Sequence, residues 1–471
     1  MQTLKAEPGS FRDPYGKIFY VDDNILRVAR YDGINRINFI SKNNLLEKLI
    51  SQDYLIDSKI TNQYDSIIDN IEEKIIIKHK KIPFISYPYE WSFEQLKDAA
   101  IHHLDLHLFL LENNATLIDA SAYNIQFNIN KPIFIDILSI KEYVEGEFWL
   151  AHKQFCENFL NPLILKSKKG INFNNWFKGN LDGIKTEEIY SILNIKDFFS
   201  YNIFTNIFLM NYFDKKILKE ESKKKIDLKK KKIDLKKKKL SKVALVSILK
   251  QLRSFIKNLN YVKSKTTWDT YSQNNTYKKN EEDEKKKIVT NFILKNKFNH
   301  LVDMGCNDGV YSEISLSSGC KLVVGFDYDL NSVENAYIKA KNENLNLLPL
   351  YLDAANPSSN LGWDETERKG FKARAKFDGM LALAFEHHLA IAKNIPLEQT
   401  LKWLINIAPK GLIEFVPKND ETIKKMLLLK GDIFNDYNEQ NFKDIILKNA
   451  KIVSEHNVSA SGRKIFEYNV L

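Results

Sequence analysis

The chain has 471 residues, of which 44% are hydrophobic, so wholesale disorder is excluded and two or three ordinary domains can be built. The formal net charge of +10 has one source: residues 214–242 hold 15 Lys against 5 Asp and Glu, and the remainder is close to neutral. A single lysine run is weaker evidence for nucleic-acid binding than basic residues spread over a folded face, so nucleic acid is not the partner we expect.

The cysteines and the hydropathy pattern bear on the compartment. Cys156, Cys306 and Cys320 are odd in number and far apart, which excludes a disulfide framework and a CxxC metal site. The N-terminus lacks an apolar signal-peptide core, and no run of about 18 apolar residues occurs. These observations predict a cytoplasmic protein without a transmembrane segment or a bound metal.

Residues 1–213 predict one α+β domain. Turn-rich, β-like segments come first, and a helix is expected from Ser92, where Gln95 completes a capping box and apolar residues return at helical spacing. Two short apolar strands follow, NIQFNI and PIFIDIL.

Residues 214–242 predict a lysine-rich, low-complexity linker. The heptapeptide KIDLKKK occurs twice in tandem, beginning at Lys225 and Lys232, and carries too little apolar surface to fold alone. A solvated linker is the main interpretation, and weak contact with an anionic membrane surface or RNA is the alternative. Residues 243–262 then predict an amphipathic helix whose apolar face is formed by Leu245, Ile248, Leu252, Ile256 and Leu259.

Residues 263–471 predict an α/β domain with a doubly wound, seven-stranded sheet and helices on both faces. Apolar runs alternate with helical patterns, which is typical of a parallel sheet. The last two runs have no helix between them and predict an antiparallel end. The seven runs are HLVDMGC, KLVVGFDYD, NLLPLYLD, FDGMLALAF, GLIEFVP, KIVSEH and KIFEYNVL.

The first of these strands leads into a glycine-containing turn, in the motif LVDMGCNDGVYSE. The strand ends at Asp303, and a turn through Gly305, Asn307 and Gly309 precedes a helix. Small residues let the backbone turn sharply and approach a ligand closely, and the helix N-terminus then offers free amide groups. A glycine-rich turn alone is weak evidence for a nucleotide site.

Acidic residues at the next two strand ends strengthen the prediction. Asp327 ends the second strand about twenty residues on, where a carboxylate can accept hydrogen bonds from ribose hydroxyls, and Asp353 ends the third. The turn is acidic and lacks the three-glycine spacing that serves a pyrophosphate. A carboxylate at Asp303 favours the α-amino group of S-adenosylmethionine (SAM) over a dinucleotide phosphate.

This order of motifs closely resembles the class I SAM-dependent methyltransferase family, and it implies SAM as the cofactor. The alternative is an α/β domain whose glycines serve only turns and whose acids only cap helices. The resemblance implies that Asp303, Gly305, Asn307 and Gly309 contact the methionine part, Asp327 the ribose, and Asp353 and Ala354 the adenine. Cys306 and Tyr328, which lie beside these residues, are expected to contact the cofactor as well.

A narrower resemblance covers nearly the whole chain apart from the lysine-rich run. The segments PGSFRDPYG, ISYPYEWSFEQLKDAA, DASAYNIQF, LALAFEHHLAI and IEFVPK resemble bacterial methyltransferases named after a rhizobial host-specific nodulation protein. This resemblance supports the two-domain layout and defines no methyl acceptor.

Catalytic candidates follow the fourth strand, where class I methyltransferases commonly line the acceptor pocket. Glu386, His387 and His388 lie there, and a histidine with a pKa near neutrality suits a general base. The alternative is that one histidine caps the next helix and the other packs beneath it. Trp268 and Tyr271 are candidate lids over the sulfonium or, equally, core aromatics, and Glu414 is a candidate for the acceptor side.

The N-terminal domain carries a kinase-like pattern. Asp119, Asn124 five residues later and Asp136 after a strand resemble a kinase catalytic loop with its metal-binding Asp, which implies a base and two magnesium ligands for ATP. Three features depart from that pattern. Leu117 stands where such kinases have His, no Gly-rich loop is evident, and no strand Lys with a Glu partner on a helix can be identified, although Arg27 or Arg30 could occupy that strand. The alternative is that these residues hold turns in an acceptor-recognition domain.

Two functions follow from these patterns. In the first, a SAM-dependent methyltransferase modifies an oxygen or nitrogen of a small-molecule, glycan or lipid-linked acceptor that the N-terminal domain presents. In the second, the SAM fold is a ligand-binding or scaffold module and the chemistry belongs to a kinase-like, ATP-binding half, or the enzyme is bifunctional.

Overall fold

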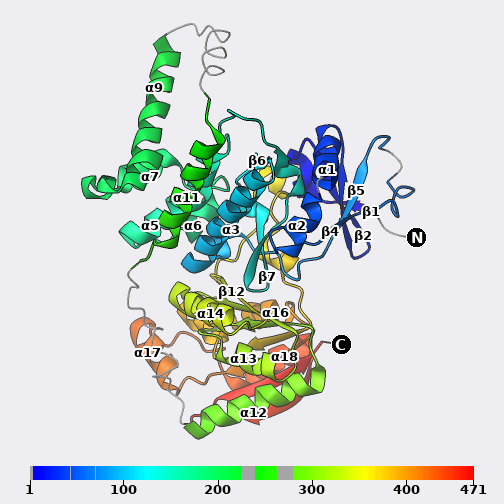
Figure 1. The fold of residues 1–471 in the computed structure, drawn as a ribbon. Helices are drawn as coiled ribbons and strands as arrows, with labels where there is room; N and C mark the ends of the chain where they lie inside the picture. Colours follow the sequence, from blue (N-terminus) through cyan, green and yellow to red (C-terminus); the bar gives the residue numbers. More distant parts are fainter. Residues whose placement is uncertain (1–3, 43, 69–70, 224–238, 262–278, 471) are drawn as a thin grey trace. The chain divides into compact units, whose positions relative to one another are not determined.

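The structure is a computed structural model that describes residues 4–42, 44–68, 71–223, 239–261 and 279–470. The chain divides into two units (Figure 1). Unit 1 comprises residues 1–82, 87–128 and 132–264, and unit 2 comprises residues 83–86, 129–131 and 265–471.

Unit 2 contains a seven-stranded sheet in the order β12-β11-β10-β13-β14-β16-β15. All neighbouring strands are parallel except β16, which is antiparallel to both β14 and β15. The predicted doubly wound sheet with an antiparallel end is therefore confirmed. The strands are β10 (His300–Met304), β11 (Leu322–Asp327), β12 (Leu347–Tyr351), β13 (Gly379–Ala382), β14 (Lys410–Phe415), β15 (Lys451–Asn457) and β16 (Lys464–Asn469).

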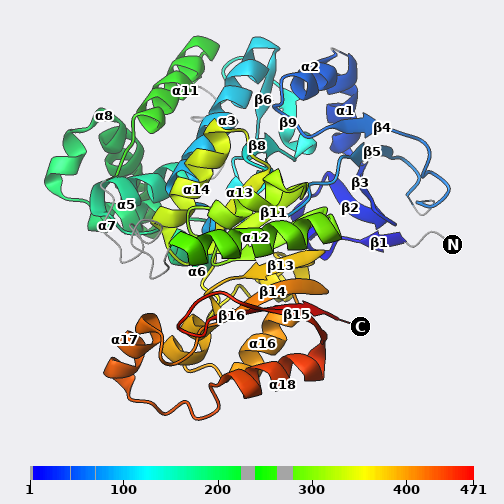
Figure 2. The ribbon, with the colours of Figure 1, turned by 90° about the horizontal axis from the view of Figure 1, so that it is seen from below.

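Helices cover both faces of this sheet (Figure 2). Helices α12 (Lys279–Asn296), α13 (Val310–Ser317) and α14 (Leu330–Asn342) lie on one face, and α16 (Leu397–Ile405) and α18 (Glu439–Asn449) lie on the other. Two buried layers result: Phe292 of α12 packs in the core under β10, and Phe442 of α18 packs 5.1 Å from the Phe415 ring. Unit 2 also contains η8 (Trp363–Glu365), α15 (Phe371–Arg374), the π-helix η9 (His388–Ala392) and α17 (Glu421–Lys430).

The strand order places a crevice beside β10. Strand β11 lies on one side of β10 and β13 on the other, so the connections run in opposite directions from this point. Parallel sheets of this kind bind ligands outside the carboxyl ends of the strands at such a reversal. The glycine turn after β10 lies at that edge.

Unit 1 begins with a five-stranded antiparallel sheet in the order β1-β2-β3-β5-β4. Its strands are β1 (Leu4–Ala6), β2 (Gly16–Val21), β3 (Asn24–Ala29), β4 (Ser58–Ile60) and β5 (Ile75–His79), with α1 (Asp32–Lys42) and α2 (Leu45–Ser51) between β3 and β4. Their buried side chains include Val21, Leu26, Val28 and Ile76, in one core cluster.

The rest of unit 1 is mainly helical. Helix α3 (Phe93–Glu112) begins at Ser92, whose side chain accepts from Gln95 N while Gln95 caps Ser92 in return, as the sequence predicts. The short ladders β6 (Ala115–Leu117) with β9 (Ile140–Glu142) and β7 (Ile125–Asn128) with β8 (Lys131–Phe134) follow. Further helices of unit 1 are η1 (Pro8–Arg12), η2 (Pro88–Glu90), η3 (Ala122–Asn124), η4 (Ile137–Ser139), α4 (His152–Phe155), η5 (Cys156–Leu160), α5 (Asn161–Lys169), α6 (Asn174–Gly179), α7 (Thr186–Ile192), η6 (Ile195–Phe199), α8 (Tyr201–Ile203), η7 (Phe204–Leu209) and α9 (Met210–Lys223).

Two details differ from the sequence-based expectations. Helix α9 continues to Lys223, so the stretch expected to be a linker begins inside a helix, because Lys, Leu and Glu are good helix formers. The amphipathic helix α11 (Lys242–Lys257) buries Leu249 and leaves Ile248 36% exposed, although Ile248 was the residue expected on the apolar face. Helix α11 belongs to unit 1, where Arg253 pairs with Asp105 of α3 (2.9 Å).

Among the described helices, none combines the length and the apolar composition that crossing a membrane requires.

Candidate functional site

The turn after β10 needs glycine for two separate reasons. Gly305 (φ +78°) and Gly309 (φ +84°) adopt left-handed conformations that favour glycine. A Cβ on Gly305 would also lie 2.9 Å from the Phe385 ring. The turn is held to β11, because the Gly305 and Cys306 amides donate to the Phe326 carbonyl at 2.8 and 3.1 Å.

Asp327, at the end of β11, is held by backbone amides. Asn307 N donates to its Oδ2 and Asp329 N to its Oδ1, each at 2.8 Å. Loss of water around the carboxyl group is the main cause that raises its pKa to about 6. Each carboxylate oxygen keeps a second lone pair for a ligand.

Asp303 lies beneath the turn rather than on its surface. Its side chain is 2% exposed, and the Ser312 hydroxyl donates to its Oδ2 at 2.6 Å. Burial raises its pKa to about 6; the Ser312 bond opposes this shift and the nearby Asp327 adds to it. Asp303 is therefore a buried carboxyl group that links the end of β10 to the first turns of α13.

A cavity of about 220 Å³ opens above the turn. It is bounded by the carboxyl ends of four strands and by η9, and its polar lining includes the three carboxylates of Asp327, Asp329 and Asp353. The lining residues are Met304, Gly305, Asn307, Phe326, Asp327, Tyr328, Asp329, Leu352, Asp353, Ala354, Ala355, Leu383, Ala384, Phe385, His388, Leu389, Ala392 and Lys393.

The structure brings seven of the expected site residues to this cavity: Gly305, Asn307, Asp327, Tyr328, Asp353, Ala354 and His388. Asp303, Cys306 and Gly309 lie in or beside the same turn but do not line the cavity. Asp303 and Cys306 are buried, and Gly309 caps α13. Trp268 and Tyr271 lie outside the described residues.

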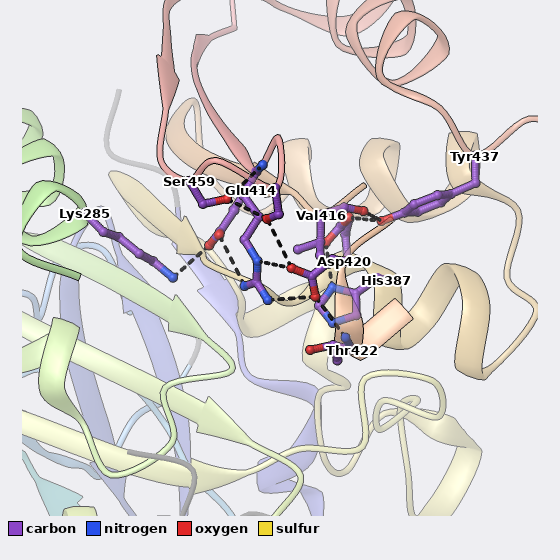
Figure 3. A network of polar contacts seen from close by, with 11 residues as sticks. Lys285, His387, Glu414, Val416, Asp420, Thr422, Tyr437 and Ser459 are labelled. Carbon is purple, nitrogen blue, oxygen red and sulfur yellow. Dashed lines mark hydrogen bonds and ion pairs between the residues drawn. The ribbon is translucent and has the colours of Figure 1, made fainter. Parts of the chain in front are cut away.

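Glu386 and His387 lie behind the cavity wall. Both are buried, and Glu386 Oε2 lies 3.3 Å from His387 Nδ1 (Figure 3). The Tyr437 hydroxyl lies 2.6 Å from Glu386 Oε1 and 2.8 Å from the Val416 carbonyl oxygen, so its single proton serves one of two acceptors. Of the three catalytic candidates, only His388 lines the cavity.

His388 is held against this buried group. Its ring centroid lies 4.2 Å from that of His387. Burial, and then the neighbouring His387, lower the pKa of His388 well below the usual value, so its imidazole is neutral at pH 7. The expected pKa near neutrality is therefore wrong for His388: one ring nitrogen can accept a proton, but the lowered pKa makes this imidazole a weaker base than a free histidine.

Glu414 belongs to a second buried polar network (Figure 3). Lys285 Nζ of α12 lies 2.7 Å from Glu414 Oε2, and both side chains are 3% exposed or less. Arg463 donates to Asp420 at 2.8 and 3.0 Å, at the start of α17. Glu414 is not among the cavity-lining residues, so the expected role on the acceptor side gains no support.

The kinase-like residues of unit 1 lie near an arginine. Arg27 of β3 pairs with Asp136 at 2.9 Å and with Asp13 at 3.0 Å. Asp119 Oδ1 accepts from Ser121 N at 2.9 Å; burial, and then the charge of Asp136, raise its pKa. The structure therefore gathers carboxylates here, and a cation of the protein itself already pairs with two of them.

Within the described ranges, no group of three or more His, Cys, Asp and Glu side chains is arranged to hold a metal ion.

A relative extends the evidence to the whole chain. No family model matches the sequence. The nodulation protein NoeA of Rhizobium meliloti (strain 1021) is 40% identical over 463 residues, which cover 98% of this chain and 95% of the relative. The chain belongs to the NoeA family.

Solved methyltransferase structures resemble part of this NoeA-family chain. Magnesium protoporphyrin IX methyltransferase from Synechocystis, solved with bound S-adenosylhomocysteine (SAH), is 18% identical and covers 41% of this chain and 84% of its own (TM-score 0.30). The N-methyltransferase NodS from Bradyrhizobium japonicum is 12% identical, and the match covers 40% of this chain and 96% of NodS (TM-score 0.29). The fold assignment depends on the sheet itself, whose strand order is that of class I SAM-dependent methyltransferases.

The sequence reasoning missed several cavity residues, namely Phe385, Leu389, Ala392 and Lys393. They come from the π-helix η9 and the segments beside it. The sequence there is an apolar run that predicts only an ordinary buried segment. Their one signal was position, since they follow directly on the fourth predicted strand. The Tyr437 contact had no local signal, because Tyr437 lies 51 residues from Glu386.

Proposed function

We propose that this NoeA-family chain is a SAM-dependent methyltransferase whose cavity beside β10 holds the cofactor. The supporting observation is a cavity lined by the glycine turn, Asp327 and Asp353 at the strand reversal of a class I methyltransferase sheet. The residues present fit the cofactor: the turn leaves space that a Cβ would fill, and three carboxylates line the cavity against one lysine. Such a lining favours a positively charged nucleoside over a phosphorylated one.

Each lining group has a proposed role. Asp327 accepts from ribose hydroxyls with its remaining lone pairs, while Asn307 N and Asp329 N fix its orientation. Asp353 and Ala354 contact the adenine, and Gly305 and Asn307 approach the methionine part through the backbone. Asp303 supplies negative charge beneath that part.

His388 is the proposed general base. When bound, SAM supplies an electrophilic methyl group on a positively charged sulfur. His388 accepts the proton that an acceptor hydroxyl or amine loses as that oxygen or nitrogen takes the methyl group. The buried Glu386 and Tyr437 hold His387, against which the His388 ring lies. The proposed acceptor is a small molecule, glycan or lipid-linked precursor.

Calorimetric titration with SAM tests the cofactor site. Asp327→Asn keeps the shape but removes the charge, and we expect SAM affinity to fall between about tenfold and about hundredfold, the loss of one charge-assisted hydrogen bond. Asp364→Asn is the matched control, because Asp364 is an exposed carboxylate outside the cavity and Asn tolerates its φ of +53°. Equal affinity in both variants would contradict the assignment.

The same titration separates the alternative function. ATP·Mg binding that is lost in Asp136→Ala, in a protein that takes up no SAM, would support a kinase-like unit 1 instead. Incubation with methyl-labelled SAM and cell-extract fractions then identifies the acceptor by what becomes labelled.

A further inference from the structure

Unit 1 exposes a concentrated group of large apolar side chains between η6 and α9. Ile195 and Phe199 of η6 are 83% and 85% exposed, and Tyr201 of α8 is 64% exposed. Phe204 is 38% exposed, and Tyr212 and Phe213 of α9 are each more than half exposed. We call these six residues the aromatic patch. Exposed apolar groups of this density are uncommon on a soluble surface and mark interaction sites.

A packed aromatic base supports the patch. The Phe204 ring stacks on Phe208 at 5.1 Å, and Phe198 and Tyr190 lie 5.7 and 5.9 Å from Phe208. Ile203 and Ile207 are fully buried beneath. The exposed rings therefore stand on a fixed core, and binding through them costs less conformational entropy than binding through a loose segment.

The charges around the patch are cationic. The two acidic residues between Ile195 and Lys216 are already paired, Asp197 with Lys169 and Asp214 with Lys153, each at 2.7 Å. The side chains of Lys196, Lys215 and Lys216 are exposed. The patch thus combines apolar contact area with three exposed lysines, while the acidic Glu157 and Glu187 lie close enough to Lys153 to interact with its charge.

The sequence that follows the patch adds to this charge. Residues 214–242, the first ten of which belong to α9, hold 15 Lys against 5 acidic residues, a net charge of +10. Lysines in a repeated, low-complexity order suit a diffuse anionic surface rather than one shaped partner. Aromatic and aliphatic side chains that insert at the headgroup level, beside a polybasic segment, are the two signals that together give stable peripheral attachment.

We propose that the aromatic patch docks this protein on an anionic membrane surface, with the neighbouring lysines drawing it to the lipid headgroups. The patch supplies the apolar insertion, and charge alone supplies only a salt-sensitive attraction. This inference concerns unit 1 and is independent of the SAM site.

Co-sedimentation of the full chain with vesicles tests the proposal. We expect binding to phosphatidylcholine vesicles that contain phosphatidylglycerol and little binding to phosphatidylcholine alone. The double variant Ile195→Ser/Phe199→Ser should lower the partition coefficient about tenfold or more, since two apolar groups leave the interface. Leu428→Ser is the matched control, because Leu428 is 84% exposed on α17 of unit 2.

Three outcomes would overturn the proposal. One is equal vesicle binding by the double variant and the unaltered chain, which would leave only electrostatic attraction. Another is equal loss of binding in Leu428→Ser. The third is a dimer in solution without vesicles that the double variant converts to a monomer, which would assign the patch to a second copy. Limited proteolysis and circular dichroism of the double variant should match those of the unaltered chain, and this shows that unit 1 of the variant is folded.

Discussion

Both units bring aspartates together, but they hold them in opposite ways. In unit 1, Asp13 and Asp136 share the guanidinium of Arg27. In unit 2, Asp327 is held by two backbone amides, and Asp303 by a serine hydroxyl. The guanidinium offsets the charge of one of the two carboxylates in unit 1, whereas carboxylates held only by neutral donors keep their full negative charge for a cationic ligand. The partner of each carboxylate, more than its position, therefore distinguishes the two clusters.

Replacing Arg27 tests the role of the protein cation in unit 1 and has the largest expected effect. Arg27→Met leaves two partly buried carboxylates without a counter-charge, and we expect a loss of about 3 kcal/mol in stability at neutral pH. Chemical denaturation followed by tryptophan fluorescence measures it. Lys81→Met is the control, since Lys81 pairs with Asp23 at the exposed surface and should cost less than about 1 kcal/mol. Similar losses in the two variants would show that Arg27 has no special role.

The glycine turn tests the other side. Gly305→Ala forces a Cβ into a left-handed backbone and against Phe385, so the turn that presents Asn307 N to Asp327 must shift. We expect a stability loss of about 2 kcal/mol and weaker SAM binding. Gly170→Ala shares the positive φ (+69°) but meets no atom within 4 Å, and should cost only about 1 kcal/mol with SAM affinity unchanged. If both variants bind SAM equally, the turn does not position Asp327.

The pH dependence of SAM affinity tests whether the charges of Asp303 and Asp327 act on the ligand, and it has the smallest expected effect. Asp303 and Asp327 have pKa values raised to about 6, so their charge is lost as the pH falls through 6. Affinity at pH 5 should be about tenfold lower than at pH 7.5, because about one tenth of such a group is ionised there. SAH, whose sulfur is neutral, should show a smaller change. A flat profile for SAM would argue that neither carboxylate senses the ligand charge.

The same shifts act on stability with the opposite sign. A carboxyl group whose pKa is raised in the folded protein binds more protons in that state than in the unfolded chain. Stability contributed by Asp303 and Asp327 therefore falls as the pH rises from about 4 to about 6 in the ligand-free protein. Bound SAM should reduce this loss, because its positive charge compensates the ionised carboxylates.

The sequence by itself determined the sheet of unit 2 and the center of its cavity. Strand periodicity, the Gly305–Gly309 turn and the acids at successive strand ends are local patterns, and local patterns report local backbone geometry directly. The capping box at Ser92 was predictable for the same reason. These features needed no knowledge of what packs against them.

Only the tertiary structure decided which neighbouring side chains face the cavity. Glu386, His387 and His388 are consecutive, yet Tyr437, far along the chain, holds Glu386 in the interior, while His388 lies at the cavity wall. In the same way, Arg27 reaches Asp136 and Lys285 reaches Glu414 across more than one hundred residues. Buried charges take whichever partner the fold brings near, since leaving them unpaired is costly, and that choice is not encoded in any short stretch of sequence.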